Sequence, residues 1–389
     1  MEEWKEYKLE DICSDIFAGG DAKKLKITQE KNSINRIPVY ANSVDKDGLY
    51  GYCQTPIVLK PAVTVAARGS GTGFVAYRKE PFVPIVRLIT LITKNNVDIQ
   101  FLYYNLKNRN LKGDGSAIPQ ITIPMIKKEI VSIPNIHIQR KISGILSSLD
   151  NKIELNHRIN ENLEQQAQAL FKSWFVDFEP FKDGLFVDSE LGKIPEGWKV
   201  VELKDVTTLV TEKVKQRTHI KVLSPISTGE LVLSESYFTK QVYSQNIEKY
   251  IIVKPMQFAY NPARVNIGSI GMNSYDFDGC VSPVYVVFEC EKNYQYFFDC
   301  FRKTSQFKEE VISRAIGGVR QSLNYKDFSL IKITYPPDHI IDNFNDIYLS
   351  LLKLKRFVEK ESQKLSQLRD TLLPRLMSGE LEIKDNSYD

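Results

Sequence analysis

The chain repeats part of its own sequence about halfway along its length, and this repeat constrains the fold more than any other feature. Residues near the N-terminus recur 194 positions later in the same order. The matched pairs are Trp4 with Trp198, Leu9 with Leu203, Asp11 with Asp205, and Ile12 with Val206. A chain of 389 residues is too long for one compact core, so the repeat predicts at least two similarly built domains.

The repeat continues along both halves of the chain. Ile57-Val-Leu-Lys-Pro61 matches Ile251-Ile-Val-Lys-Pro255 at the same offset of 194. Later pairs are offset by 202, which places a net insertion of eight residues in the second copy. These later pairs are Val131-Ser-Ile-Pro134 with Ile333-Thr-Tyr-Pro336, Leu163 with Leu365, and Leu170 with Leu372. The shared order of the matches favours a tandem duplication.

Each copy has a β-rich part followed by a long helix. Residues 1–135 and 198–337 are rich in β-branched and aromatic residues and contain turn signals, which predicts mixed α+β domains. Turn signals almost vanish over 136–178 and 338–378, where apolar residues recur every three or four positions. This period is typical of a helix, and forty residues of helix span about 60 Å. A linker, 179–197, breaks the first helix, and an acidic tail, 379–389, follows the second.

The two predicted helices carry the apolar seam of a coiled coil. The seam residues are Ile142, Leu146, Leu149, Ile153, Leu163, Ala167, Leu170 and Trp174 in the first helix, and Ile347, Leu351, Leu354, Val358, Leu365, Leu368 and Leu372 in the second. Asn156 and Asn160 fall on the first seam and Glu361 interrupts the second, where they are expected to fix the register. Because the linker is short, we expect an antiparallel pair with one domain at each end. The alternative is that each helix packs only on its own domain.

The positive charge of the chain is concentrated in the two β-rich parts. The whole chain carries a net charge of +4, whereas residues 1–135 carry +5 and residues 198–337 carry +4. The linker and the tail are acidic. Two basic domains on a rigid spacer suggest a ligand with regularly spaced negative charge, and duplex DNA is the obvious candidate.

Composition argues against several other classes of protein. The five cysteines show no C-x-x-C pairing and no histidine at zinc spacing, which favours incidental thiols in a reducing compartment over a metal or disulfide framework. The N-terminus lacks the apolar segment of a signal peptide. The most apolar run, 85–93, is too short to cross a bilayer and contains Arg87. We therefore expect a cytoplasmic protein without a membrane segment.

No arrangement of residues indicates catalysis, so we expect no catalytic and no metal-binding residue in this chain. The glycine-rich residues 68–73 are not followed by Gly-Lys-Ser/Thr, and a loop between two strands explains them better than a phosphate cradle. Tyr260-Asn-Pro-Ala-Arg264 is similar to the Asn-Pro-Pro-aromatic signature of amino-methyltransferases, but Ala263 and Arg264 replace the second proline and the aromatic residue. The four histidines are scattered along the sequence and form no metal site or triad.

Three strings of residues are specific enough to indicate a family. They are Leu170-Phe-Lys-Ser-Trp-Phe-Val-Asp-Phe-Glu-Pro180, Glu190-Leu-Gly-Lys-Ile-Pro-Glu-Gly-Trp198 and Leu372-Leu-Pro-Arg-Leu-Met-Ser-Gly-Glu-Leu381. Together with the duplicated plan, they resemble the specificity subunit of type I restriction–modification systems over essentially the whole chain. The resemblance implies an α+β fold of two tandem, mostly-β target-recognition domains, separated by two long antiparallel coiled-coil helices with a pseudo-twofold internal repeat.

The resemblance also implies a non-catalytic subunit with a DNA-binding role. Each domain would read one half of a split duplex site, and the helices would set the spacer and dock two modification (methyltransferase) subunits. Those subunits would bind S-adenosylmethionine and methylate adenine, while restriction (translocase/endonuclease) subunits would use ATP and Mg to cleave DNA. Two alternatives remain open. One is a stand-alone bipartite DNA-binding protein such as a repressor, and the other is a coiled-coil scaffold that binds proteins.

Candidate DNA contacts follow from residue type, because arginine, amide and hydroxyl side chains read base edges while lysine and arginine mostly hold phosphates. The candidates for base readout are Arg68, Ser70 and Thr72 in the first domain, and Asn261, Arg264, Asn266, Arg320 and Gln321 in the second. The candidates for phosphate contacts are Lys23, Lys24, Lys79, Lys213, Lys215 and Arg217.

Overall fold

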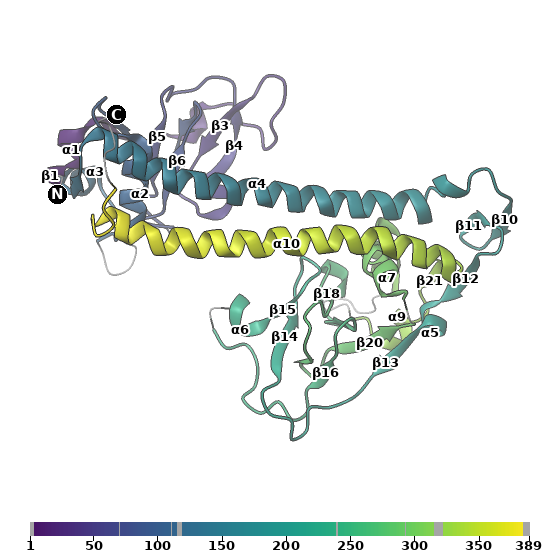
Figure 1. Ribbon diagram of the computed structural model, residues 1–389. Coiled ribbons are helices and arrows are strands. Elements are labelled where there is room, and N and C mark those ends of the chain that lie inside the picture. The colour runs from purple at the N-terminus through teal and green to yellow at the C-terminus, as the bar shows by residue number, and fades with distance from the viewer. Residues whose placement is uncertain are drawn as a thin grey trace. The chain divides into compact units, whose positions relative to one another are not determined.

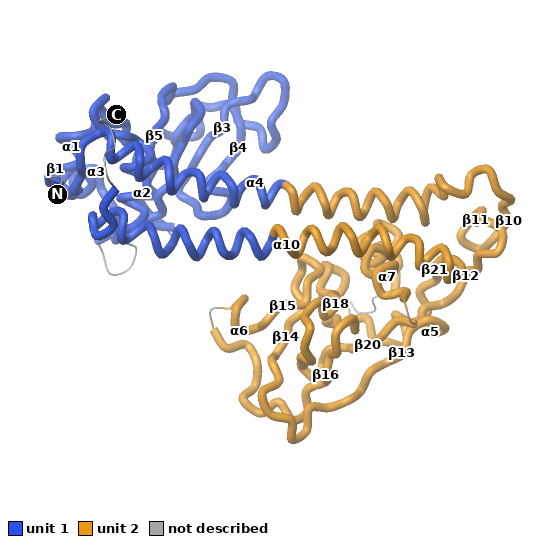
Figure 2. The backbone as a smooth tube through the Cα atoms, viewed as in Figure 1, with its two compact units in different colours: residues 1–158, 359–389 blue, residues 159–358 orange. Residues whose placement is uncertain are grey.

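The structure is a computed structural model that describes residues 4–69, 71–109, 111–114, 119–238, 240–291, 293–314 and 322–383, without the side chain of Lys24. The chain forms two compact units. Unit 1 consists of residues 1–158 and 359–389, and unit 2 consists of residues 159–358 (Figure 2). Both units combine helices with sheets, which confirms the mixed α+β class.

The core of unit 1 is a four-stranded antiparallel sheet in the order β2-β8-β5-β6. Its strands are β2 (Cys13–Ala18), β8 (Ile89–Thr93), β5 (Ala62–Val65) and β6 (Val75–Arg78). A second sheet has the order β4-β3-β7, with β4 at Leu49–Cys53, β3 at Ile37–Tyr40 and β7 at Val83–Pro84. A third joins β1 (Lys5–Lys8) to β9 (Ile130–Ile133).

Three short helices complete the domain of unit 1. They are α1 (Leu9–Ile12), α2 (Ile99–Arg109) and α3 (Ile123–Lys128). Helix α2 buries Phe101 and Leu102 in the same apolar core as Val63 and Leu91 of the four-stranded sheet. The central strand β5 is buried along its whole length, because apolar side chains cover both of its faces, and it therefore lacks the polar alternation of a surface strand.

Unit 2 contains a four-stranded antiparallel sheet in the order β13-β20-β17-β18. Its strands are β13 (Thr207–Val210), β20 (Val286–Cys290), β17 (Phe258–Tyr260) and β18 (Ile270–Met272). A second sheet has the order β15-β14-β19-β16, with β15 at Leu231–Leu233, β14 at Lys221–Pro225, β19 at Gly279–Val281 and β16 at Ile251–Val253. Strand β12 (Lys199–Glu202) pairs with β21 (Lys332–Tyr335).

The remaining elements of unit 2 are short. Five helices are α5 (Leu203–Val206), α6 (Ser234–Tyr237), α7 (Gln295–Phe301), α8 (Ser305–Arg314) and α9 (Tyr325–Phe328). The predicted linker contains an antiparallel hairpin of β10 (Phe186–Ser189) and β11 (Gly192–Pro195). Aromatic rings dominate the core, where Phe258 stacks on Phe288 at a centroid distance of 5.3 Å.

The two units share local details at the residues that repeat in the sequence. Asp11 of α1 accepts a hydrogen bond from the backbone N–H of Lys8, and Asp205 of α5 accepts one from the backbone N–H of Glu202. Each aspartate therefore satisfies a donor at the start of a short helix. Leu9 and Leu203, which match in the sequence, are both fully buried.

Two helices of 40 residues, α4 (Ile136–Phe175) and α10 (Asp338–Met377), are labelled in Figure 1. Each of them contributes to both units (Figure 2). Within unit 1, the Nδ2 group of Asn156 donates to Glu361 Oε2 at 2.8 Å, and Arg369 Nη1 donates to Asp150 Oδ1 at 2.8 Å. The residue number on α10 rises as the number on α4 falls, so the helices run antiparallel there. Within unit 2, Phe171 of α4 and Phe344 of α10 pack with ring centroids 6.3 Å apart.

The buried face of α10 differs from the predicted seam, and the prediction was wrong at Ile347, Leu354 and Leu368, which are 44%, 47% and 47% exposed. Helix α10 instead buries Phe344 and Tyr348 in the core of unit 2. Because the helix packs on its own domain as well as on α4, its buried face is wider than a coiled-coil seam and rotated from it. Elsewhere on the predicted seams, Ile142, Leu146, Ile153, Leu163, Ala167 and Val358 are buried, and Leu149, Leu170, Trp174, Leu351, Leu365 and Leu372 are half-buried.

Candidate nucleic-acid interface

In unit 1, residues 68–73 form the loop between β5 and β6, with Ser70 outside the described part. We call it the unit 1 loop. Backbone hydrogen bonds hold its base, where Gly73 N donates to Ala66 O and Ala66 N donates to Phe74 O, both at 2.9 Å. Gly73 has a φ of +88°, and a Cβ atom there would lie 2.0 Å from Leu111 O. The glycine therefore serves a turn with close backbone approach, and a strand rather than a helix follows it.

The candidate side chains of the unit 1 loop have different roles. The hydroxyl of Thr72 donates to Gly69 O at 2.8 Å and approaches Pro119 O at 3.2 Å, so it shapes the loop. Arg68 is exposed, while its backbone pairs with that of Gln120. Arg68 is therefore the described candidate of this loop whose side chain is available to a ligand.

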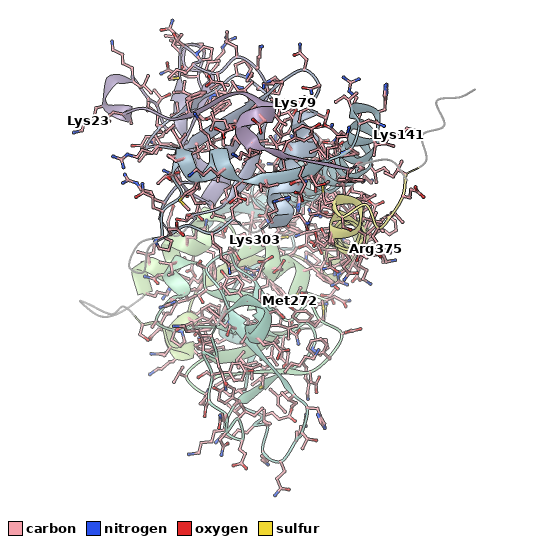
Figure 3. The ribbon with its side chains drawn as sticks, turned by 90° about the vertical axis from the view of Figure 1, so that its left-hand side faces the viewer. Lys23, Lys79, Lys141, Met272, Lys303 and Arg375 are labelled. Atoms are coloured by element: carbon pink, nitrogen blue, oxygen red, sulfur yellow. The ribbon has the colours of Figure 1, made fainter. Side chains whose placement is uncertain are left out.

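The lysine candidates of unit 1 lie on its surface. Lys23 and Lys79 are both exposed (Figure 3), whereas the side chain of Lys24 lies outside the described part. Sequence reasoning missed the neighbouring Arg78, which is buried with its guanidinium 3.7 Å from the ring centroid of Tyr40. Burial lowers the pKa of Arg78. Its Nη2 group donates to Asp47 O at 2.6 Å, so Arg78 supports the turn at the start of β4.

In unit 2, residues 261–269 connect β17 to β18, and we call them the unit 2 loop. The Oδ1 atom of Asn261 accepts from Ala263 N at 3.0 Å, and Arg264 N donates to Asn261 O at 2.9 Å. Asn261 therefore shapes the turn with its side-chain oxygen. Gly268 has a φ of +91°, and a Cβ atom there would lie 2.7 Å from Ser227 O. Asn266 is half-buried, and Arg264 is exposed.

The other candidates of unit 2 differ in how well the structure supports them. Lys213 and Lys215 are exposed lysines, whereas Arg320 and Gln321 lie outside the described residues. Arg217 Nη2 pairs with Glu212 Oε1 at 2.5 Å, and its Nη1 lies 3.6 Å from Asp278 Oδ2. These two carboxylates partly neutralise Arg217, which makes it a weaker candidate for phosphate contacts than the two lysines.

The two loops occupy the same place in sheets of the same order. The four-stranded sheets have the orders β2-β8-β5-β6 and β13-β20-β17-β18. In each sheet the strand before the loop, β5 or β17, is an inner strand, and the strand after it, β6 or β18, is an edge strand. Each loop exposes one arginine, Arg68 or Arg264. Each unit thus presents a hairpin tip with a side chain that can donate two parallel hydrogen bonds.

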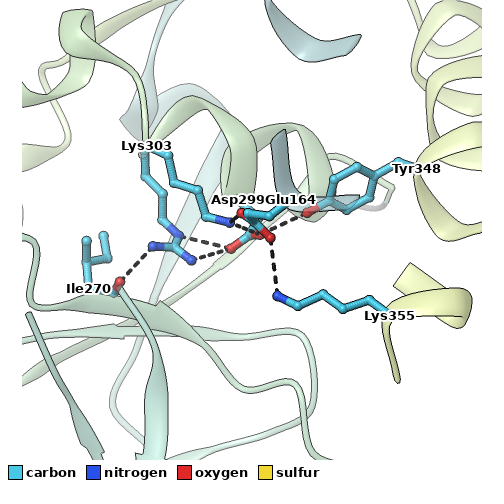
Figure 4. A network of polar contacts seen from close by, with 7 residues as sticks. Glu164, Ile270, Asp299, Lys303, Tyr348 and Lys355 are labelled. Carbon is cyan, nitrogen blue, oxygen red and sulfur yellow. Dashed lines mark hydrogen bonds and ion pairs between the residues drawn. The ribbon is translucent and has the colours of Figure 1, made fainter. Parts of the chain in front are cut away.

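A network of charges with a buried centre connects strand β18, which directly follows the unit 2 loop, to the long helices (Figure 4). Arg302, just after α7, donates from Nη1 to the backbone oxygen of Ile270, the first residue of β18, at 2.9 Å. Its Nε and Nη2 groups donate to Asp299 Oδ1 at 3.0 and 2.5 Å. The side chain of Arg302 is only 5% exposed and that of Asp299 only 10%.

The network continues from Asp299 to α4 and α10 within unit 2. The hydroxyl of Tyr348 on α10 donates to Asp299 Oδ2 at 3.1 Å. Glu164 on α4 accepts from Lys303 at 2.5 Å and from Lys355 on α10 at 3.2 Å. Burial alone would raise the pKa of Asp299, but the charges of Arg302 and Lys303 lower it to about 2. These residues are far apart in the sequence, and no pattern there signals the network.

Three further findings bear on other classes of function. Over the described residues, no group of three or more His, Cys, Asp or Glu side chains is placed to hold a metal ion. No helix in that part of the chain is long and apolar enough to cross a membrane. Cys13, Cys53, Cys280 and Cys300 are buried free thiols, and burial raises their pKa values.

Comparison with known proteins identifies relatives of this chain. A family model described as a type I restriction modification DNA specificity domain matches residues 1–165. The chain is 26% identical, over 98% of its length, to the type I restriction enzyme MjaIX specificity subunit of Methanocaldococcus jannaschii, of which it covers 94%. Over 31% of its length it is 32% identical to the C-terminal part of a putative type I specificity subunit of Mycoplasma pneumoniae, of which it covers 82%. The chain belongs to the family of type I restriction–modification specificity subunits.

The resemblance inferred from the three sequence strings is thereby confirmed, and as a type I specificity subunit the chain is non-catalytic. A solved structure adds support for the fold. The crystal structure of a type I specificity subunit from M. genitalium matches with a TM-score of 0.64 and 18% identity, covering 96% of each chain. This type I specificity subunit therefore shares its fold with a solved member of the family.

Proposed function

We propose that this specificity subunit reads a bipartite site in duplex DNA, with unit 1 contacting one half and unit 2 the other. The observation that carries the proposal is the pair of corresponding loops, each exposing one arginine, Arg68 or Arg264. Arginine is the side chain that most often recognises guanine, through two hydrogen bonds in the major groove. The description of the matching family model as a DNA specificity domain supports this role.

Electrostatics supports DNA as the ligand. Lys23, Lys79, Lys213 and Lys215 are exposed and would contact phosphates, and the β-rich parts carry net charges of +5 and +4. Phosphate contacts release counterions, so binding should weaken steeply as salt rises. A protein-binding scaffold would show little dependence on duplex DNA or salt. A stand-alone repressor would bind DNA but would purify without a methyltransferase.

The helices α4 and α10 would act as the spacer between two recognition domains that arose by duplication. Two half-sites read from one face of DNA lie roughly one helical turn, about 34–36 Å, apart. Adding or removing a few residues in both helices would change distance and rotational phase together. We expect such variants to recognise a spacer altered by about one base pair, or to lose binding. An unchanged spacer would rule out this role.

The same two helices would dock the modification subunits. Apolar side chains are exposed at positions 202 residues apart, with Ile145 and Leu155 on α4 exposed by 40% and 51%, and Ile347 and Phe357 on α10 by 44% and 66%. Buried positions follow the same offset, as in Ile142 with Phe344 and Leu146 with Tyr348. Each helix thus offers an equivalent apolar face, which suits two copies of one partner. S-adenosylmethionine, ATP and Mg are expected on the partner subunits.

Methylation mapping combined with two substitutions tests the proposal. In cells expressing the chain with its modification partner, we expect a split motif with methyladenine in each half. Arg264→Ala should relax recognition in one half of the motif only, because it removes a base contact. Lys213→Ala, the matched control in the same unit, should weaken binding to all duplexes about equally. If Arg264→Ala also weakened all sequences equally, Arg264 would be a phosphate contact and its base-reading role would be wrong.

A further inference from the structure

Unit 2 contains a cavity of ≈ 560 Å³ beside the unit 2 loop. Arg264 and Asn261 of that loop line it on one side, and Tyr237 of α6 and Tyr285 line it elsewhere. Its volume lies within the range of about 300–1,000 Å³ that is usual for sites that bury a small ligand. The proposed reading of base edges in the groove requires protruding side chains and leaves this cavity without a role.

The chemistry of the lining selects a class of ligand. The described residues that line the cavity include aromatic rings, several serine hydroxyls and one cation, Arg264, and among them there is no aspartate or glutamate. The absence of carboxylates disfavours a cationic ligand or a metal ion. Aromatic rings provide faces on which a nucleobase stacks, and hydroxyl and amide groups provide hydrogen bonds to its edge.

The position of the cavity favours a base from the DNA over a free nucleotide. Arg264 belongs both to the cavity lining and to the exposed tip of the unit 2 loop, so a duplex held by the loop would lie against the cavity. A base within the helical stack cannot enter a cavity, because its two faces are covered by its neighbours. Only a nucleotide that leaves the stack can fill the space.

We infer that this cavity receives one nucleobase displaced from the duplex within the half-site that unit 2 reads. The base stacks on the tyrosines, and the serine hydroxyls of the lining hydrogen-bond to its edge, while Arg264 keeps its base contact in the groove. The inference rests on the proposed reading of DNA by unit 2. It adds a second means of recognition, because the size of the cavity and its hydrogen-bonding groups select which base can enter.

A mismatch scan of the DNA tests this inference. In the complex of the chain with its modification subunits, each base of the half-site read by unit 2 is left in place while the opposite base is changed, and affinity for the duplex is measured. Mismatches weaken binding where the protein reads an intact pair. They strengthen it where a base must be extruded, because the pair no longer has to be opened. We expect about a tenfold gain at one pair other than that of the methylated adenine.

Two substitutions test whether the gain in affinity for the mismatched duplex depends on the cavity. Tyr237→Ala should abolish it, and Tyr237 is 52% exposed, so the substitution leaves the fold intact. Tyr50→Ala, at a tyrosine of unit 1 that is 49% exposed, is the matched control and should leave the gain unchanged. Site-specific binding in which every mismatch weakens the complex, or a gain that survives Tyr237→Ala, would overturn the inference while leaving the proposed function intact. Loss of all site-specific binding in the unsubstituted complex would instead refute the proposed function.

Discussion

The buried network around Asp299 predicts which of its charges unit 2 needs most. In this network the cations Arg302, Lys303 and Lys355 form ion pairs with the carboxylates of Asp299 and Glu164. Asp299→Asn would leave all of these cations on one carboxylate, with Arg302 buried and without its counterion. Removing one partner of a buried pair in this way costs about 3–5 kcal/mol. We therefore expect Asp299→Asn to lower the free energy of unfolding of unit 2 by that amount.

Removing Arg302 should cost less than removing Asp299. Arg302→Met leaves Lys303 and Lys355 facing two carboxylates, so the charges balance. It also leaves the carbonyl of Ile270 without its partner, which costs about 1–3 kcal/mol. In the double variant neither charge remains unpaired, because both members of the pair are gone. We expect its total cost to exceed that of Arg302→Met by no more than about 1 kcal/mol.

Tryptophan fluorescence during urea unfolding measures these costs. In a Trp4→Phe background, the remaining Trp174 and Trp198 both belong to unit 2, so their emission reports on that unit. Glu310→Gln, which breaks a half-exposed pair with Arg314 on α8, is the control and should cost less than about 1 kcal/mol. Equal costs for Asp299→Asn and Arg302→Met, adding without coupling in the double variant, would refute the reasoning.

Three further predictions follow from features of the two units. Gly73→Ala should destabilise unit 1 by more than about 2 kcal/mol, since the new Cβ atom would lie 2.0 Å from Leu111 O. The control Gly69→Ala has a similar positive φ but nothing within 4 Å of its Cβ position, so it should cost only about 1 kcal/mol. Equal decreases of the thermal unfolding temperature for the two variants would contradict this prediction. The pKa of Asp299 is about 2 in the folded chain and 3.8 for the free side chain, so its ionised carboxylate stabilises unit 2 by roughly 2 kcal/mol above pH 3.8. This stabilisation is lost as the pH falls toward 2. The difference in unfolding free energy between wild type and Asp299→Asn should therefore shrink on acidification, and a constant difference would contradict this prediction. Ile145→Glu and Ile347→Glu should each leave one modification subunit bound instead of two, as measured by native mass spectrometry, and unchanged stoichiometry would exclude these positions from the docking face.

The sequence predicts features that depend on local pattern. Asp11 and Asp205 match in the sequence, and they make the same hydrogen bond in the structure. The glycines at 71 and 73 indicate a loop between strands, and the backbone bonds of that loop agree. In both cases the interaction joins residues only a few positions apart in the chain, so the local sequence is enough to predict it.

Features that depend on packing between distant segments could not be predicted from the sequence. The face that α10 buries was misassigned because apolar residues were assumed to mark the seam. In the structure Leu354 is exposed while Tyr348 is buried against the domain core. The Asp299 network also left no pattern, because its members come from α4, from α7 and the turn after it, from α10 and from β18. Asn261 was expected to face a ligand, but its side-chain oxygen is used within the loop, which only the local backbone geometry reveals.

Neither loop uses the side chain of its exposed arginine to keep its shape, and this has a consequence for evolution. The unit 1 loop is held by main-chain bonds, by Gly73 and by the hydroxyl of Thr72. The unit 2 loop is held by main-chain bonds, by Gly268 and by the side-chain oxygen of Asn261. The residues at 68 and 264 can therefore be exchanged with little penalty to the fold. Lineages descended from this chain should diversify at these two positions through single substitutions, while the residues that hold each loop stay the same.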